Sequence, residues 1–473
     1  MSAADAFNSN LTSREAALRF LDDRVDFERQ MSVPYRAKEF KLDHIRQLLA
    51  RLGNPHHGLP IVHIAGTKGK GSTAAMTGAV LTAAGYRTGV YTSPHLDRVE
   101  ERIAVDGSPC SSDEFVALVA RVAPAVEAMD REATACSSPD SGPTYFDVTT
   151  AMALVHFADR KVDAAVLEVG LGGRLDSTNV CEPLVSVITS ISFDHTKLLG
   201  STLESIAREK AGIIKPGVPV VSSAVSPEPQ EVIRHVCREK GCRLVELGVD
   251  FDSTYDPPHQ VESAPGMGKM DFHYRVAGRE HQYRNVLLKL LGRHQAANAA
   301  VALAALAELR ALGWAIPEQA VHDGLAQVVW PARVELVARR PAIIVDAAHN
   351  LASVDALTRV LDESFSAPRR LLVFATTREK DAPGMLSLLV SRFDHVVFTR
   401  YLSNPRAVPP QELETIAAEL TGRRYPVFDE PAAAWDAIRA IAAPDDLICV
   451  TGSFFIAAEM RAQIRDRPLG KDE

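Results

Sequence analysis

One stretch of the chain, Ile61 to Tyr86, limits the possible folds more than any other. It opens with an apolar run of strand type, Ile61 to Ala65, continues in the glycine-rich turn GTKGKGS, Gly66 to Ser72, and ends in an alanine-rich segment that predicts a helix as far as Ala84. A strand, a glycine loop and a helix in this order are typical of a phosphate-binding loop, because the glycines let backbone N–H groups turn inward and the helix N-terminus adds positive potential. The sequence therefore predicts a nucleotide-binding α/β domain.

The loop differs from the common pattern at one position. Lys70 supplies the usual point charge, but Gly71 follows it where Ser or Thr is common, and Ser72 comes one residue later. The magnesium-holding hydroxyl is therefore expected from elsewhere in the chain. A plain turn between a strand and a helix, with spare glycines, is the simpler alternative, but the strand, loop, lysine and helix all agree with phosphate binding.

Polar residues follow three strand-like runs downstream of the loop. Ser93 lies in TSPHL after the run Arg87 to Tyr91, Glu168 ends AAVLEV, and His195 follows LVSVITSI within SFDH. The carboxyl ends of parallel strands are where such sheets bind ligands, so these groups are candidates for a magnesium site. Each has a simpler reading: Ser-Pro often just turns a chain, a glutamate often forms an ion pair, and a lone His is usually a polar loop residue. The charged run around Lys210 reads, by itself, as a solvated helix face.

A further segment, Thr144 to Asp147, opens a predicted helix. Asp147 suits the first turn of that helix, where a carboxylate interacts well with the helix dipole. The two aromatic residues beside it, Tyr145 and Phe146, could form one wall of a pocket for a flat ring. The pattern of the sequence favours packing of both rings in the core. The glycine-rich segment after Glu168 carries two polar residues, Asp176 and Ser177, whose side chains are candidates for contact with a ligand.

A second α/β pattern begins after the predicted hinge Trp330 to Arg333. Its strand-like runs alternate with helices over about 140 residues, which is an ordinary domain size. Its first strand ends in the polar run Asp346 to Asn350. The fold class is therefore predicted to be α/β, with a parallel-rich phosphate-loop ATPase domain over residues 1–332 and a smaller Rossmann-like domain over residues 333–473.

Composition excludes several classes of protein. A net charge of −8 over 473 residues argues against a broad nucleic-acid surface. The six cysteines form no CxxC pair, and neither a signal peptide nor a run of about 18 apolar residues is visible. We therefore expect a cytoplasmic protein without membrane spans.

Some segments read as irregular. Arg98 to Arg102 is predicted to be a solvated loop or hairpin edge, Cys136 to Pro143 a surface insertion, and Asp250 to Lys269 an irregular loop. Asp271 to Val276 and Gln282 to Leu288 are predicted to pair as an antiparallel hairpin.

Taken together, the motifs resemble those of the folylpolyglutamate synthase and dihydrofolate synthase family, within the wider Mur ligase superfamily. The matching pieces run through nearly the whole chain in the order of that family: GTKGKGS, YTSPHL, TYFD, LEVGLGGRLDSTN, SFDHTKLLGSTLESIAREKAGIIK, GRHQAANAAVALAAL, WPARVE, DAAHN and VTGSFF. This sequence departs from the usual pattern at four positions, which are Lys68 for Asn, Ala332 and Ala347 for Gly, and Asp147 for Glu.

The resemblance implies a role for each matching residue. Catalysis would involve Lys70, Lys210 and His349. ATP would be held by Thr67, Lys68, Gly69, Lys70, Gly71, Ser72, Asn298, Arg333 and Asp346, and magnesium by Ser93, Glu168 and His195. Lys210 matches a lysine that is carbamylated (N6-carboxylysine) in the family. The pterin substrate would lie on Thr144, Tyr145, Phe146, Asp147, Leu175, Asp176 and Ser177.

The resemblance also implies a reaction. It is the addition of L-glutamate to dihydropteroate or to a reduced folate through an acyl phosphate, with ATP as co-substrate and Mg²⁺ as cofactor. It allows for a monovalent cation as well, and it predicts a monomer that binds small molecules and no nucleic acid. Two other functions stay open: a Mur-type cell-wall amino-acid ligase, and a non-catalytic nucleotide-binding switch, against which the absence of an Asn-Lys-x-Asp motif speaks.

Overall fold

The computed structural model describes residues 11–26, 42–135, 142–194 and 196–466. The chain divides into two compact units. The first consists of Met1–Ser253, Asp271–Val286 and Ala297–Val328, and the second of Thr254–Met270, Leu287–Ala296 and Val329–Glu473. The predicted insertion at residues 136–143 lies mostly outside the described residues, and His195 lies outside them entirely.

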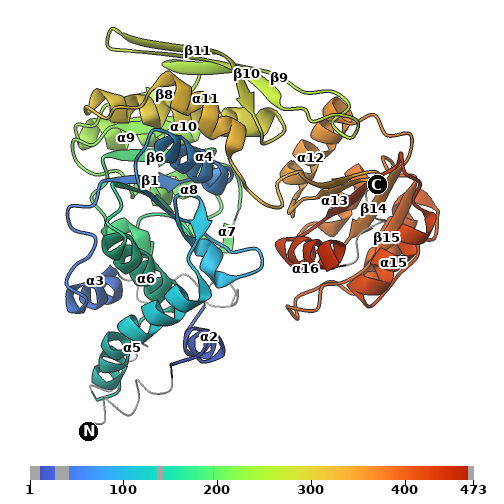
Figure 1. Ribbon diagram of the computed structural model, residues 1–473, viewed down its shortest axis with the longest axis horizontal. Coiled ribbons are helices and arrows are strands. Elements are labelled where there is room, and N and C mark those ends of the chain that lie inside the picture. Colours follow the sequence, from blue (N-terminus) through green and yellow to red (C-terminus); the bar gives the residue numbers. More distant parts are fainter. Residues whose placement is uncertain (1–10, 27–41, 136–141, 195, 467–473) are drawn as a thin grey trace. The chain divides into compact units, whose positions relative to one another are not determined.

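The first unit is built on an eight-stranded sheet with the order β4-β3-β2-β5-β1-β6-β7-β8. Its strands are β1 (Ile61–Ala65), β2 (Thr88–Tyr91), β3 (Ile103–Val105), β4 (Ser108–Pro109), β5 (Ala164–Glu168), β6 (Val185–Ile188), β7 (Val220–Ser222) and β8 (Leu244–Glu246). Figure 1 labels β1, β6 and β8 of this sheet. The six strands from β2 to β8 in this order are parallel, and β3 and β4 extend the sheet in antiparallel fashion. The predicted parallel-rich sheet is therefore confirmed.

The position of β1 in this sheet determines where the phosphate loop lies. All five of its residues are buried, and β5 and β6 flank it in parallel. An apolar run without alternation is what a strand covered on both faces requires. The loop that leaves the carboxyl end of β1 therefore lies beside the carboxyl ends of β5 and β6.

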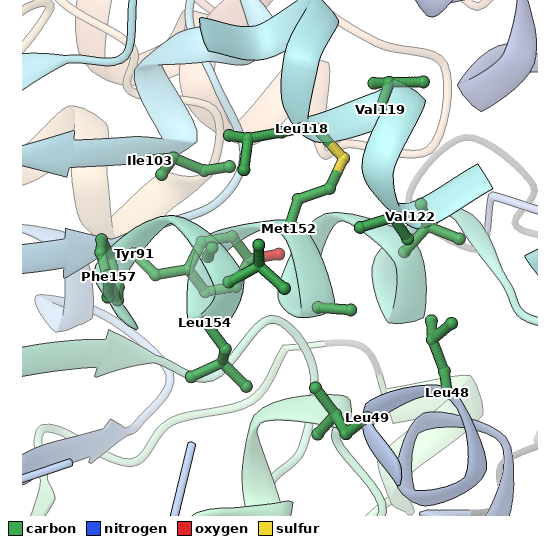
Figure 2. Packing of buried hydrophobic residues seen from close by; sticks show 14 of the residues in the cluster. Leu48, Leu49, Tyr91, Ile103, Leu118, Val119, Val122, Met152, Leu154 and Phe157 are labelled. Carbon is green, nitrogen blue, oxygen red and sulfur yellow. The ribbon is translucent and has the colours of Figure 1, made fainter. Parts of the chain in front are cut away.

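Helices cover the sheet of the first unit. They are α2 (Arg14–Asp22), α3 (Leu42–Arg51), α4 (Lys70–Ala83), α5 (Ser112–Ala135), α6 (Tyr145–Asp159), α7 (Thr196–Leu199), α8 (Leu203–Ala211), α9 (Pro227–Glu239), α10 (Arg293–Ala311) and α11 (Glu318–Gln327), with the short 3₁₀ helices η1 (Val99–Arg102) and η2 (Ser177–Val180). The first four residues of α10 belong to the second unit. Figure 2 shows how α3, α5, α6 and β2 meet in one buried cluster, through Leu48, Leu49, Leu118, Val122, Met152, Leu154 and Tyr91.

The second unit contains a five-stranded sheet with the order β12-β13-β16-β14-β15. Its strands are β12 (Glu335–Arg339), β13 (Ala342–Val345), β14 (Arg370–Phe374), β15 (His395–Phe398) and β16 (Leu447–Thr451). Its helices are α12 (Leu351–Ser364), α13 (Ala382–Leu389), α14 (Pro410–Thr421), α15 (Pro431–Ile441) and α16 (Phe454–Asp466). Four strands are parallel and β12 is antiparallel, so the predicted smaller Rossmann-like α/β fold is confirmed.

A three-stranded sheet, β11-β10-β9, corrects one prediction. The sequence predicted a two-stranded hairpin after an irregular loop, but the loop contains strand β9 (Phe251–Asp256) ahead of β10 (Gly268–Val276) and β11 (Arg279–Leu288). The alternation FDSTYD buries only Phe251 fully, so its strand character is masked by polar residues that face solvent.

A second correction concerns Arg98 to Arg102, which is not the predicted solvated segment. It forms η1, and both Glu100 and Arg102 are buried. Glu100 accepts hydrogen bonds from Arg14 at 2.6 Å and from Arg98 at 2.7 Å, so charge pairing explains the burial.

None of the helices in the described part of the chain combines the length and the apolar character that a membrane span needs.

Candidate active site

The phosphate loop joins β1 to α4, as the sequence predicted. α4 begins at Lys70, and its N-cap residue Gly69 has a φ of 87°, which a residue without Cβ adopts at little cost. A Cβ added at Gly69 would lie 2.1 Å from Oδ1 of Asn298. The structure therefore brings Asn298 of α10 against the loop, and both the conformation and this close approach require glycine at position 69.

Two loop residues bind the segment that follows β6. The N–H of Thr67 donates to the carbonyl oxygen of Ser190 at 2.7 Å. The ammonium group of Lys68 pairs with Asp194 at 2.6 Å, and the carbonyl oxygen of Lys68 accepts from the hydroxyl of Thr189 at 2.8 Å. Lys68, the residue that departs from the family pattern, thus holds the loop against the segment that leads to His195.

Ser93 and Glu168, two of the predicted magnesium ligands, lie together. Glu168 is the last residue of β5 and only 4% exposed, and its register partner on β1 is Ile64. The backbone N–H of Ser93, two residues after β2, donates to Oε2 of Glu168 at 3.1 Å. The carboxyl ends of three neighbouring strands therefore converge beside the phosphate loop. The third predicted ligand, His195, lies outside the described residues.

Lys210 is buried, although the sequence alone read its surroundings as a solvated helix face. Its exposed fraction is 4%, and its Nζ donates to the carbonyl oxygen of Gly66 at 2.7 Å. Burial, with a further contribution from the charge of Lys70, lowers the pKa of Lys210 to about 7. The helical spacing that makes Ile206, Ala207, Lys210 and Ala211 one buried face was the signal in the sequence.

Two of the segments predicted to bind substrate are tied to each other by Asp147. Its Oδ1 accepts from the hydroxyl of Ser177 at 2.6 Å, and its Oδ2 accepts from the backbone N–H of Thr144 at 2.9 Å. Thr144 in turn caps α6 by accepting from the N–H of Asp147 at 3.1 Å. Asp147 thus positions both the start of α6 and the start of η2.

Asp176 is held by its own hydrogen bonds. Its two carboxylate oxygens accept from the N–H groups of Thr178 at 3.0 Å and of Leu171 at 2.9 Å. Burial raises the pKa of Asp176 to about 6 in spite of these bonds. The side chain therefore shapes the glycine-rich loop before η2.

The two aromatic residues of the segment Thr144 to Asp147 lie in different environments. Tyr145 is buried in the core under the guanidinium group of Arg102, whose Cζ lies 5.2 Å from the ring centroid. Phe146 is partly buried, and a Cβ on Gly170 would lie 2.6 Å from its ring. Core packing thus holds for Tyr145, while Phe146 and the half-buried Leu175 keep some surface exposed.

The candidate residues of the second unit gather around Phe454 of α16. The guanidinium carbon of Arg333 lies 4.8 Å from the Phe454 ring centroid, and the ring of His349 lies 5.8 Å from it. Asp346 is buried and accepts from the N–H groups of Val334 and Ala348, both at 2.8 Å. Burial raises the pKa of Asp346, and the charge of Arg333 opposes that rise.

The structure also shows two residues that the sequence reasoning did not select. Asp194 pairs with Lys68, and the acidic residue beside His195 in SFDH was the signal for it. Phe454 organises Arg333 and His349, and the signal was the phenylalanine pair in VTGSFF.

Comparison with known proteins defines the class. The family model "Mur ligase middle domain" matches residues 64–306, and "Mur ligase, glutamate ligase domain" matches residues 332–454. The protein is therefore a Mur-type ligase, an enzyme that forms carbon–nitrogen bonds.

Relatives of established name narrow this class. The dihydrofolate synthase/folylpolyglutamate synthase of Bacillus subtilis is 35% identical over 90% of this chain and 95% of its own, and the Escherichia coli enzyme of the same name is 34% identical over 91% and 92%. Folylpolyglutamate synthase of Mycobacterium tuberculosis, solved with ADP and AMPPCP, superposes with a TM-score of 0.82 at 33% identity, covering 97% of this chain and 100% of that one. E. coli FolC, solved with DHPP and ADP, gives 0.79 at 33% identity and covers 96% and 98%. The chain belongs to the folylpolyglutamate synthase/dihydrofolate synthase family.

Proposed function

We propose that this ligase joins the amino group of L-glutamate to the carboxylate of dihydropteroate, to the γ-carboxylate of a reduced folate, or to both, at the expense of ATP. The observation that carries the proposal is the meeting of a phosphate loop, the strand-tip carboxylate Glu168 and the buried amine of Lys210 at one sheet edge. That arrangement occurs in a chain that matches a named dihydrofolate synthase/folylpolyglutamate synthase over 90% of its length.

In the first step, the acceptor carboxylate attacks the γ-phosphorus of ATP, and ADP leaves. Carboxylate and triphosphate repel each other, so this step needs positive charge beside them. Lys70, the first residue of α4, supplies an ammonium group, and the N–H groups of the first turn of α4 point toward an anion at the loop. The product of this step is an acyl phosphate.

In the second step, the amine of glutamate attacks the acyl carbon. The carbon–oxygen bond to phosphate breaks, inorganic phosphate leaves, and the amine loses a proton as the amide forms. We assign Arg333 and Asp346 to nucleotide binding and His349 to shielding of the acyl phosphate. The contacts of Arg333 and His349 with the ring of Phe454 support this assignment, because they hold the two side chains in fixed positions.

The donor set beside the phosphate loop fits Mg²⁺. Glu168 offers a buried carboxylate and Ser93 a neighbouring hydroxyl, and oxygen donors of this kind are those that Mg²⁺ prefers. We propose Ser93, Glu168 and His195 as its ligands. When bound, Mg²⁺ neutralises charge on the phosphate oxygens.

Lys210 is proposed to carry a carbamate. An amine with a pKa of about 7 is about half unprotonated at pH 7, and the lone pair of the unprotonated form can attack the carbon of CO₂ with release of a proton. The carbamate would add a negative charge beside Lys70, whose charge already acts on Lys210. We leave a monovalent cation as a further candidate for this region.

The segments around Asp147 and Ser177 are proposed to bind the pterin. The exposed parts of Phe146 and Leu175 support this role, because a flat ring packs well on such side chains. The hydrogen bond between Ser177 and Asp147 would keep the two segments at a fixed spacing.

The deciding experiment uses Lys70→Ala. The purified chain is offered ATP, Mg²⁺ and glutamate with dihydropteroate or tetrahydrofolate, and products are read by mass. We expect addition in the wild type and a loss of at least about a hundredfold in Lys70→Ala, with unchanged circular dichroism. The control is Lys269→Ala, which removes an exposed lysine of β10. Addition to neither substrate by the wild type, or full activity in a folded Lys70→Ala variant, would overturn the proposal.

A cell-wall ligase that acts on a UDP-linked peptide is the second candidate, since the Mur domains are common to both. The names of the relatives favour the folate substrate. A panel that compares dihydropteroate with UDP-muramoyl peptides separates the two. A non-catalytic switch would hydrolyse ATP slowly and ignore every acceptor carboxylate.

We further propose a cytoplasmic monomer with a functional division near residue 332. The match of the glutamate ligase domain to residues 332–454 supports the division. None of the five cysteines in the described part of the chain takes part in a disulfide.

A further inference from the structure

A cavity of about 620 Å³ lies in the first unit, away from the phosphate loop. Its walls come from α3 and the loop after it, from η2, and from the residues that lead into β6 and β7. Those segments enter the parallel strands at their amino ends, whereas the phosphate loop leaves β1 at the carboxyl end. The cavity and the phosphate loop therefore lie at opposite ends of the parallel strands. Five strand residues, the length of β1, span about 16 Å.

The cavity is lined by more basic than acidic groups. Arg46, His56, His57 and Lys215 line it, and among the described lining residues Glu182 carries the one carboxylate. The imidazole rings of His56 and His57 are 4.4 Å apart. Burial lowers the pKa of Lys215, and the positive charge of Arg46 contributes to the same shift. Cationic groups that lie close enough to repel each other are stabilised by an anion between them.

Two buried polar atoms of this wall lack a partner within the described part of the chain. They are Oδ1 of Asn179 and Nδ1 of His56. Asn179 is only 4% exposed. A buried polar atom without a hydrogen bond costs about 1–3 kcal/mol, so a ligand or water that satisfies it is favoured. Both residues line the cavity, so its wall contains polar groups for which the described protein supplies no partner.

The opposite part of the wall is apolar. It consists of Val180, Pro183, Pro216 and Val218. The cavity volume falls within the range of small-molecule sites, and a mixture of an apolar wall with a few polar groups is typical of such sites. An anion with an organic body fits these walls better than inorganic phosphate.

Asn179 also connects the cavity to the candidate active site. Its side-chain N–H₂ group donates to the backbone carbonyl oxygens of Arg174 at 2.9 Å and of Gly212 at 3.2 Å, and its backbone carbonyl oxygen accepts from Nζ of Lys215 at 2.9 Å. Arg174 precedes the predicted pterin segment, and Gly212 follows Lys210 by two residues. A ligand that contacts Asn179 therefore touches the junction of two active-site segments.

We propose that this cavity is a second ligand site, which binds a small organic phosphate. Arg46, His57 and Lys215 hold the phosphoryl group, and the apolar wall holds the organic body. The proposal concerns a site apart from the phosphate loop, and it does not depend on which acceptor the ligase uses.

The test measures binding of phenyl phosphate by calorimetry to the full chain without nucleotide, because ADP is itself an organic phosphate and would compete for the proposed site. Arg46 lies away from the phosphate loop, so a change of affinity on its replacement assigns the binding to the cavity. The variant is Arg46→Ala, which removes a largely exposed side chain of α3. The control is Arg51→Ala on the same helix, whose guanidinium group pairs with Glu132 at 2.6 Å instead of lining the cavity. Phenol, which has the same ring without the phosphate, is the ligand control.

We expect saturable binding of phenyl phosphate to the wild type and to Arg51→Ala, binding at least about fivefold weaker to Arg46→Ala, and none of phenol. Three results would overturn the proposal: no binding to the wild type under these conditions, equal binding of phenol, or equal affinity in the two arginine variants. Equal unfolding temperatures of the two variants would show that both are folded when compared.

Discussion

The buried ammonium group of Lys210 donates a hydrogen bond of 2.7 Å to the backbone carbonyl oxygen of Gly66, the first residue of the phosphate loop. This bond links α8 directly to the loop, although the two are 144 residues apart in sequence. A lysine in this position combines two properties: burial holds its pKa near 7, and its nitrogen lies at the loop that is proposed to bind ATP.

Lys210 is expected to make the stability of the protein depend on pH. Its pKa is about 7 when folded and 10.5 in the unfolded chain, so the unfolded state binds the proton more strongly. The cost of burying the amine is absent above pH 10.5, grows as the pH falls toward 7, and is constant below 7. Urea unfolding in CO₂-free buffer should therefore show stability rising from pH 7 to pH 10 more steeply in the wild type than in Lys210→Met. Identical slopes in the two proteins would contradict the lowered pKa.

Gly69→Ala is expected to damage nucleotide binding, while Gly85→Ala is not. Both glycines have positive φ, 87° and 91°, so each alanine costs about 1–2 kcal/mol in backbone strain. Only at Gly69 would the new Cβ meet a neighbour, Oδ1 of Asn298 at 2.1 Å, whereas nothing lies within 4 Å of the Cβ at Gly85. We expect ADP affinity to fall at least about tenfold in Gly69→Ala and to stay within twofold in Gly85→Ala. Equal ADP affinities in the two folded variants would show that the close contact between Asn298 and position 69 has no special role in nucleotide binding.

Ser177→Ala is expected to weaken acceptor binding selectively. The hydroxyl of Ser177 donates to Asp147 at 2.6 Å, and its loss should release η2 from α6 at a cost of about 1 kcal/mol in stability. KM for dihydropteroate should rise about fivefold while KM for ATP stays within twofold. The matched control is Ser186→Ala, which removes another buried hydroxyl, one that donates to the carbonyl of Ile213 at 3.3 Å. If Ser186→Ala raises KM for dihydropteroate as much, the effect is a general loss of stability.

Glu100→Gln is expected to destabilise the first unit in a pH-dependent manner. Burial by itself would raise the pKa of Glu100, but hydrogen bonds from Arg14, from the backbone of Glu100 and from Arg98, together with the charge of Arg14, lower it to about 2. The carboxylate therefore contributes stability above pH 4.5 that is lost as the pH falls toward 2. We expect Glu100→Gln to cost about 2 kcal/mol at pH 7 and the difference from the wild type to shrink below pH 4.

The control for Glu100 is Glu15→Gln. Glu15 pairs with Arg19 at 2.7 Å on the surface of α2, where both side chains are exposed. Such a pair contributes less than about 0.5 kcal/mol, so the stability of Glu15→Gln should match the wild type at pH 7. A loss at Glu100 no larger than that at Glu15 would show that the buried ion pairs do not hold η1 to α2.

Local patterns predicted the elements on which the site depends. The apolar run Ile61 to Ala65, the glycine loop and the helix that starts at Lys70 were all found in the structure, because periodicity and glycine chemistry act over a few residues. The positions of Ser93 and Glu168 at strand ends followed from the same local signals. Strand β9 was missed because its outward residues are polar, and η1 was misread because its charges are paired with residues distant in sequence.

What the sequence by itself determined is the α/β class, the phosphate loop and the family to which its motifs point. What only the tertiary structure decided is the environment of particular side chains: the burial of Lys210 against Gly66, the approach of Asn298 to Gly69, and the hydrogen bond from Ser177 to Asp147. The physical reason is that a loop or helix is encoded by neighbours along the chain. A pKa, a close contact or a buried hydrogen bond depends on which distant segments pack together.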